Sequence, residues 1–267
     1  MKKLSFLAVA FTAIVFASCG GNKTNPSDAD AQDSLKSFEQ QQIEANIKVQ
    51  FDSLAAELGK LKQTPIVNKD GTLVLSDEEK QVKPDYLLDP AVAENTTTLA
   101  EKYRMLSALQ VDKHIAELYD MPVEAYDKAI TKLAADINDP SFKAINEDEN
   151  IYETSQTLYD AMSENGRINY FWQLVSTALV EQLYITSQNT DKFITAFDDD
   201  AAANVTFRII LIQDAIERLA AYDCELDAVA TAIEPLTVLN ATTVDELKTQ
   251  LEEAKDKIVA SRNALLK

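Results

Sequence analysis

Few of the residue types from which catalytic centres are usually built occur in this chain. Its 267 residues include 5 glycines, 2 cysteines, 1 histidine and 1 tryptophan. Beyond Gly21 the glycines are Gly59, Gly71 and Gly166, and none stands in a predicted strand-to-helix turn. Neither the dinucleotide fingerprint nor the phosphate loop can therefore be written. No Gly-x-Ser-x-Gly elbow occurs either, so we expect no enzymatic activity and no cofactor.

Positive charge is also scarce. The chain has 25 Lys and Arg against 44 Asp and Glu, a formal net charge of -19. A nucleic-acid backbone would be repelled by most of the molecule, so nucleic acid is not expected as a partner. With 46% apolar and 26% charged residues, the composition is that of an ordinary folded protein.

A long apolar run occurs only near the N-terminus. Lys2 and Lys3 precede an apolar stretch over residues 4–16, and the small residues Ala17 and Ser18 follow. This order is typical of a secretory signal peptide over residues 1–18. The run is too short to predict a membrane span. Removal of Lys2 and Lys3 with the signal would change the formal net charge from -19 to -21.

The segment Phe16-Ala17-Ser18-Cys19-Gly20 resembles the lipoprotein box of Bacteroidetes lipoproteins, although Phe16 replaces the preferred Leu. The resemblance implies cleavage before Cys19, acylation of Cys19, and a lipid bilayer as partner. It further implies a place in the cell envelope, on the periplasmic face of the outer membrane. Several acyl chains would make this attachment durable. A plain signal peptide with an incidental cysteine is the alternative.

The apolar spacing after residue 32 predicts an all-α protein. Residues 19–32 contain no large apolar side chain and should form a flexible tether. Residues 33–267 show helical periodicity with short connections, which favours one domain, an up-and-down antiparallel bundle of seven or eight helices. A two-lobed protein with a boundary near 140–148 is the alternative. Residues 167–188 are the most apolar and should be central, and about 64–75 should form a small β-hairpin.

His114 is the only histidine in the chain, so any metal site with an imidazole ligand would have to use it. His114 and Glu117 are one helical turn apart, so both could face a metal ion. The His-x-x-Glu spacing is similar to part of the motif of imelysin-like helical periplasmic proteins, but Asp112 stands where that motif begins with Gly. The alternative is a histidine at the solvent edge, paired with Asp112 or Glu117.

Charged groups within apolar runs predict a buried polar network. Glu181 and Gln182 lie in one such run and Arg208 in another. An unpaired charge in the core is costly, so Glu181 and Arg208 should find each other or other polar groups if they point inward. The alternative places each on the polar stripe of its own helix.

The remaining features favour ordinary structural roles. Cys224 is left without an internal disulfide partner once Cys19 is acylated, and should be packed at a helix end. The acidic runs 147–149 and 198–200 should cap helices, and the aromatic residues 170–172 should belong to the core more than to a ligand pocket. Ser34 and Ser53 each stand in an Asp-Ser-Leu triplet that resembles the O-glycan acceptor of Bacteroidetes.

Taken together, these features predict a non-enzymatic lipoprotein that interacts with a partner or binds a ligand. The helical body resembles the all-helical lipoproteins of gut Bacteroidetes, a resemblance that implies no activity. The expected partner is an envelope protein or a small ligand. The alternative function, implied by the imelysin-like similarity, is capture of a metal or haem by His114 and Glu117.

Overall fold

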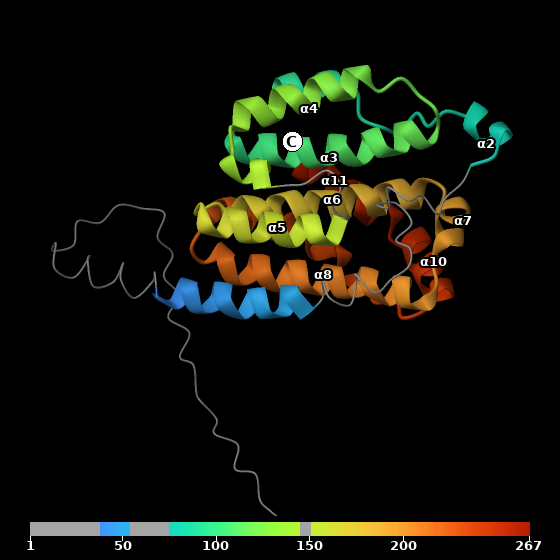
Figure 1. Cartoon of the computed structure of the whole chain (residues 1–267). Helices are drawn as coiled ribbons and strands as arrows, with labels where there is room; N and C mark the ends of the chain where they lie inside the picture. Colours follow the sequence, from blue (N-terminus) through green and yellow to red (C-terminus); the bar gives the residue numbers. More distant parts are fainter. Residues whose placement is uncertain (1–37, 54–74, 145–150) are drawn as a thin grey trace, which may run out of the picture. The chain divides into compact units, whose positions relative to one another are not determined.

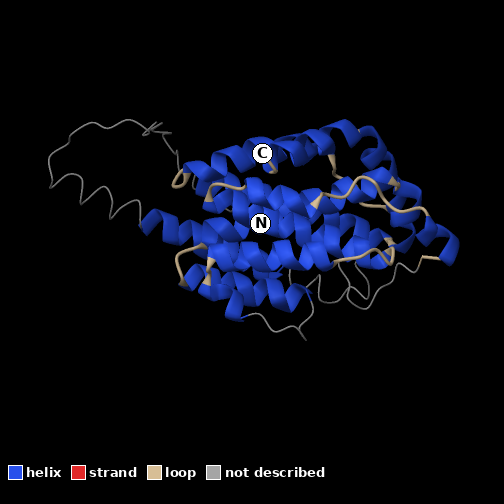
Figure 2. Cartoon of the chain, turned by 90° about the horizontal axis from the view of Figure 1, so that it is seen from above, coloured by secondary structure: helices blue, strands red, loops and turns tan. Residues whose placement is uncertain are grey.

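The computed structural model describes residues 38–53, 75–144 and 151–267. Every regular element in these ranges is a helix, as Figure 2 shows, which confirms the predicted all-α class. Residues 40–267 form one compact unit. The predicted hairpin over about 64–75 lies outside the described residues except for Leu75, which is buried and belongs to no strand.

The helices follow one another with short connections. Residues 38–53 are helical. The later elements are α2 (Asp77–Gln81), η1 (Pro90–Asn95), α3 (Leu99–Leu118), α4 (Glu124–Ile137), η2 (Pro140–Ala144), α5 (Ile151–Glu164), α6 (Ile168–Gln188), α7 (Thr190–Phe193), η3 (Ile194–Ala196), α8 (Asp199–Ala220), α9 (Cys224–Ile233), η4 (Glu234–Val238), α10 (Val244–Glu253) and α11 (Lys255–Leu265).

Helix α6 occupies the centre of the compact unit. It contacts α3, α5, α8, α9, α10 and α11, and Figure 1 shows it between α3 and α8. Its buried positions lie on all sides of the helix, as expected for the most apolar segment of the chain. Groups carried by α3 and α11 therefore meet across α6, which is what positions the candidate site.

Helix ends fall where local sequence provides caps. At the start of α3 the Thr98 side chain accepts a hydrogen bond from the Glu101 amide, and the Glu101 side chain accepts one from the Thr98 amide. The two bonds form a capping box. Gly166 ends α5 with a φ of 66°, the left-handed conformation that favours glycine. Asp198 accepts from the Ala201 amide at 2.8 Å and caps α8. Ala254 separates α10 from α11.

Aromatic side chains fill the core around the N-terminal half of α6. Phe51 stacks on Tyr159 with ring centroids 4.9 Å apart, and it meets the edges of Phe171 and Trp172. Trp172 is 0% exposed. This confirms the core role predicted for residues 171 and 172, and leaves them no part in a pocket open to solvent.

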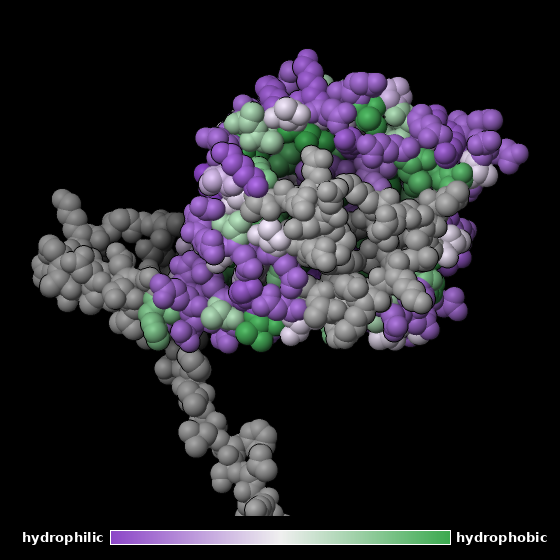
Figure 3. Space-filling model, viewed as in Figure 1, coloured by the Kyte–Doolittle hydropathy of each residue, from purple (hydrophilic) through white to green (hydrophobic). Residues whose placement is uncertain are grey.

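On the face shown in Figure 3, most of the visible described residues are hydrophilic. Hydrophobic areas on this face are small and separated by polar residues. Among the described residues, no helix has both the length and the apolar character needed to cross a membrane.

Candidate functional site

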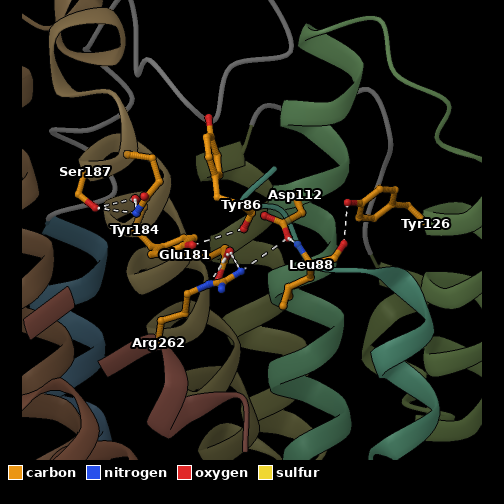
Figure 4. Close-up of polar contacts among 9 residues, drawn as sticks. Tyr86, Leu88, Asp112, Tyr126, Glu181, Tyr184, Ser187 and Arg262 are labelled. Carbon is orange, nitrogen blue, oxygen red and sulfur yellow. Dashed lines mark hydrogen bonds and ion pairs between the residues drawn. The ribbon is translucent and has the colours of Figure 1, made fainter. Parts of the chain in front are cut away.

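Three charged side chains from three helices meet in the interior. Asp112 of α3, Glu181 of α6 and Arg262 of α11 are 0%, 1% and 9% exposed. Figure 4 shows their head groups turned toward one another. Buried charges are stable only when they are paired and hydrogen-bonded, so the contacts of this charge cluster decide what it can do.

The guanidinium of Arg262 is held by Glu181 through two of its nitrogens. Arg262 Nε donates to Glu181 Oε2 at 2.7 Å and Oε1 at 2.9 Å, and Nη2 donates to Oε1 at 2.7 Å. The guanidinium also lies over the ring of Tyr184, 3.9 Å from its centroid. No hydrogen bond within the described residues uses Arg262 Nη1. The guanidinium is therefore fixed in place with one nitrogen left over.

Asp112 links the charge cluster to the connector that precedes η1. The amide of Leu88 donates to Asp112 Oδ2 at 2.7 Å, and the hydroxyl of Tyr126 donates to the Leu88 carbonyl at 2.8 Å. Asp112 Oδ2 lies 4.0 Å from Arg262 Nη2, a long ion pair. Asp112 Oδ1 is buried and has no hydrogen-bond partner among the described residues.

The surroundings of Asp112 favour its protonated form. Burial and, after it, the nearby Glu181 carboxylate raise the pKa of Asp112 to about 9, although the Leu88 amide and Arg262 lower it. The uncharged carboxyl is therefore the form of Asp112 that this environment favours. The cluster then holds one anion, Glu181, and one cation, Arg262, and the two balance.

A groove open to solvent lies beside Arg262. It is a cavity of about 410 Å³ lined by Leu88, Val92, Met105, Arg262, Asn263, Leu266 and Lys267. An adjoining cavity of about 220 Å³ shares four of these residues and adds Asn95, Thr96, Glu101 and Leu265. We call the two together the groove. Its walls come from the connector with η1, from the first half of α3 and from the end of α11.

A second buried polar cluster differs from the first in having every carboxylate oxygen satisfied. Asp139 accepts from the hydroxyl of Tyr103 through Oδ2, and from the Ser141 amide at 2.8 Å through Oδ1. Arg167 donates to the same Tyr103 hydroxyl at 2.9 Å. These contacts join α3, η2 and the start of α6, so we assign this cluster a structural role.

The structure separates Glu181 from the other two members of the predicted network, Gln182 and Arg208. Glu181 is buried, as that hypothesis required, but its carboxylate pairs with Arg262. Arg208 Nη1 donates to Gln182 Oε1 at 3.3 Å. Arg262 was missed because it follows Ser261 and precedes Asn263, and such polar neighbours give no sequence signal of burial.

His114 and Glu117 both lie on α3, one helical turn apart. No group of three or more His, Cys, Asp or Glu side chains among the described residues is placed to hold a metal. His114 is half-buried, and burial lowers its pKa while Glu117 opposes that shift. Glu117 is exposed and pairs with Lys113 at 3.5 Å. Asp112, considered as a partner of His114, binds the Leu88 amide instead.

The other predicted residues lie apart from the charge cluster. Cys224 begins α9 but is exposed, so the prediction that it is packed was wrong. Ser53 is exposed, and its hydroxyl donates to the Val49 carbonyl at 2.9 Å. Cys19, Ser34 and the acidic run 147–149 lie outside the described residues. The two cavities described above lie at the end of α11 and beside η1, and none of residues 170–172 lines either of them.

Comparison of the chain with known protein families, with curated proteins and with solved structures finds no match. What the protein does must therefore be inferred from the charge cluster and the groove.

Proposed function

We propose that this protein is a non-enzymatic ligand-binding module, an up-and-down antiparallel helical bundle tethered by acylated Cys19 to the periplasmic face of the outer membrane. The groove is the observation that supports ligand binding. Its wall contains the guanidinium of Arg262, held in place by Glu181, beside apolar side chains. A cavity of about 410 Å³ is of the size that small-molecule sites have in proteins.

The groove is built from groups suited to recognition. Val92, Met105 and Leu266 offer apolar contact, while Asn263 and Arg262 offer hydrogen bonds. The guanidinium is held by Glu181 and by the ring of Tyr184 before any ligand arrives. A group that is already ordered costs little further entropy when it binds, which favours affinity. Arginine and asparagine orient ligands, so these residues favour binding over chemistry.

Ligand binding is tested on protein recovered from its own envelope. Small molecules released on denaturation would be identified by mass spectrometry for the wild type and two variants. In Leu266→Trp a larger side chain occupies the groove. Val259→Trp is the matched control, because Val259 is also half-buried on α11 but is not a lining residue. We expect one small molecule to accompany the wild type and Val259→Trp but not Leu266→Trp. Its equal recovery from all three would contradict the proposal.

The tether is supported by the lipobox resemblance at residues 16–19 and by the polar composition of residues 20–32. Metabolic labelling with a fatty acid, followed by separation of the membranes, tests it. The wild type should incorporate label and sediment with the outer membrane. Cys19→Ser should lose the label. Equal labelling of the variant would rule out Cys19 as the anchor.

A further inference from the structure

We propose that the groove selects a small organic carboxylate. One carboxylate oxygen accepts a hydrogen bond from Arg262 Nη1, and the hydrocarbon part lies against Val92, Met105 and Leu266. This inference rests on the proposed ligand-binding function and adds the chemical class of the ligand.

Arg262 presents its remaining nitrogen from an ordered position. Its side chain is 10% exposed, and Glu181 accepts from Nε and Nη2 at 2.7 Å each. Arg262 lines the groove, and within the described part of the chain Nη1 has no acceptor. A guanidinium N–H left without an acceptor beside a cavity favours a ligand that supplies one, and a charged oxygen makes the stronger bond.

The balance of charge around Arg262 permits an anion. Glu181 offsets the guanidinium, and burial favours the uncharged form of the neighbouring Asp112. No carboxylate side chain is among the lining residues of the larger cavity. The adjoining cavity does hold an anion, Glu101, whose carboxylate accepts from the amides of Thr97 and Thr98 at 2.6 and 3.1 Å, so the ligand's carboxylate is expected in the larger cavity.

The apolar part of the groove sets the other half of the specificity. Val92, Met105 and Leu266 line both cavities. A short aliphatic chain attached to the carboxylate would cover these side chains and remove them from water. Inorganic anions lack this part, so they should bind more weakly than an aliphatic carboxylate.

Methionine methyl groups offer local reporters for a binding experiment. After Cys19 the chain contains Met105, Met121 and Met162, and of these Met105 alone is a lining residue of the groove. The protein would carry ¹³C in its methionine methyl groups and be titrated with hexanoate, hexan-1-ol or hexylammonium at pH 7. We expect hexanoate to shift the Met105 resonance saturably, and to bind about tenfold more tightly than hexan-1-ol. Hexylammonium should bind more weakly still.

A charge added at the rim tests the electrostatic part without disturbing the buried pair. Asn263 lines the groove and is exposed, so Asn263→Glu places a carboxylate where the ligand's own should lie. Ala260→Glu adds the same charge at an exposed position of α11 that is not a lining residue. Asn263→Glu should weaken hexanoate binding about tenfold and hexan-1-ol binding by much less. Ala260→Glu should change neither.

The outcomes separate this inference from the proposed function. If hexan-1-ol bound as tightly as hexanoate, or if Asn263→Glu and Ala260→Glu behaved alike, selection of a carboxylate would be refuted while the groove remained a binding site. If no probe shifted Met105, the carboxylate would also be refuted. The recovery of a small molecule from the native protein would then decide, by itself, whether the groove binds another ligand.

Discussion

Replacement of Asp112 by asparagine should abolish a pH dependence of stability that originates in the charge cluster. Asparagine keeps an oxygen for the Leu88 amide, which donates to Asp112 Oδ2 at 2.7 Å in the wild type. It cannot ionise beside Glu181. Wild type and variant therefore differ chiefly in whether this buried position must hold a proton.

The sign follows from the direction of the pKa shift. The pKa of Asp112 rises in the folded protein to about 9, whereas an aspartate in an unfolded chain has a pKa of about 4. Between these values the folded state binds a proton that the unfolded state has lost, so the free energy of unfolding falls as pH rises. The slope for one proton is about 1.4 kcal/mol per pH unit. From pH 5 to pH 8 it amounts to about 4 kcal/mol at most.

Urea unfolding at several pH values measures this effect. Trp172 is the only tryptophan and is 0% exposed, so its fluorescence reports unfolding of the core. The free energy of unfolding of Asp112→Asn should increase relative to that of the wild type as pH rises from 5 to 8. Asp136→Asn, at an exposed position of α4, controls for the loss of one formal charge.

Parallel pH profiles for the wild type and Asp112→Asn would refute the reasoning. They would mean that Asp112 is ionised in the folded protein. A variant that is less stable than the wild type at every pH, by a constant amount, would likewise exclude a proton held at this position.

Two further predictions concern stability and are checked by the same urea unfolding at pH 7. Arg262→Met leaves Glu181 buried without its partner and should cost about 3–5 kcal/mol, whereas the double variant with Glu181→Leu should recover most of that loss; no recovery would contradict the pairing. Thr98→Ala removes the hydroxyl that caps α3 and should lower the free energy of unfolding by about 1 kcal/mol. Thr97→Ala leaves the Thr98 hydroxyl in place and should lower it by less.

The parts of the fold that follow from local sequence could be predicted. The caps at Thr98 and Asp198 and the left-handed Gly166 are fixed by neighbours within four residues in the chain. The central place of α6 follows from the apolar character of residues 167–188, because such a helix is stable only when other helices surround it. These signals require no knowledge of how distant segments meet.

The candidate site could be predicted only in part, because its partners are far apart in sequence. Glu181 stood out as a charge within an apolar run, but Arg262 lies 81 residues away among polar neighbours. Asp112 gave no signal either, since its burial depends on contact with the Leu88 amide, 24 residues earlier. The groove arises where η1 meets the end of α11, and periodicity within one helix does not encode such a junction.

The Met105 methyl resonance of protein recovered from its own envelope tests the binding role of the groove most directly. Cells grown on ¹³C-methyl methionine would supply the protein, whose small molecules would then be removed by unfolding and refolding. We predict that removal shifts the Met105 resonance, that adding the extracted molecules back restores it, and that Leu266→Trp shows neither change. A Met105 resonance that is the same before removal, after removal and after addition would contradict a ligand-binding groove.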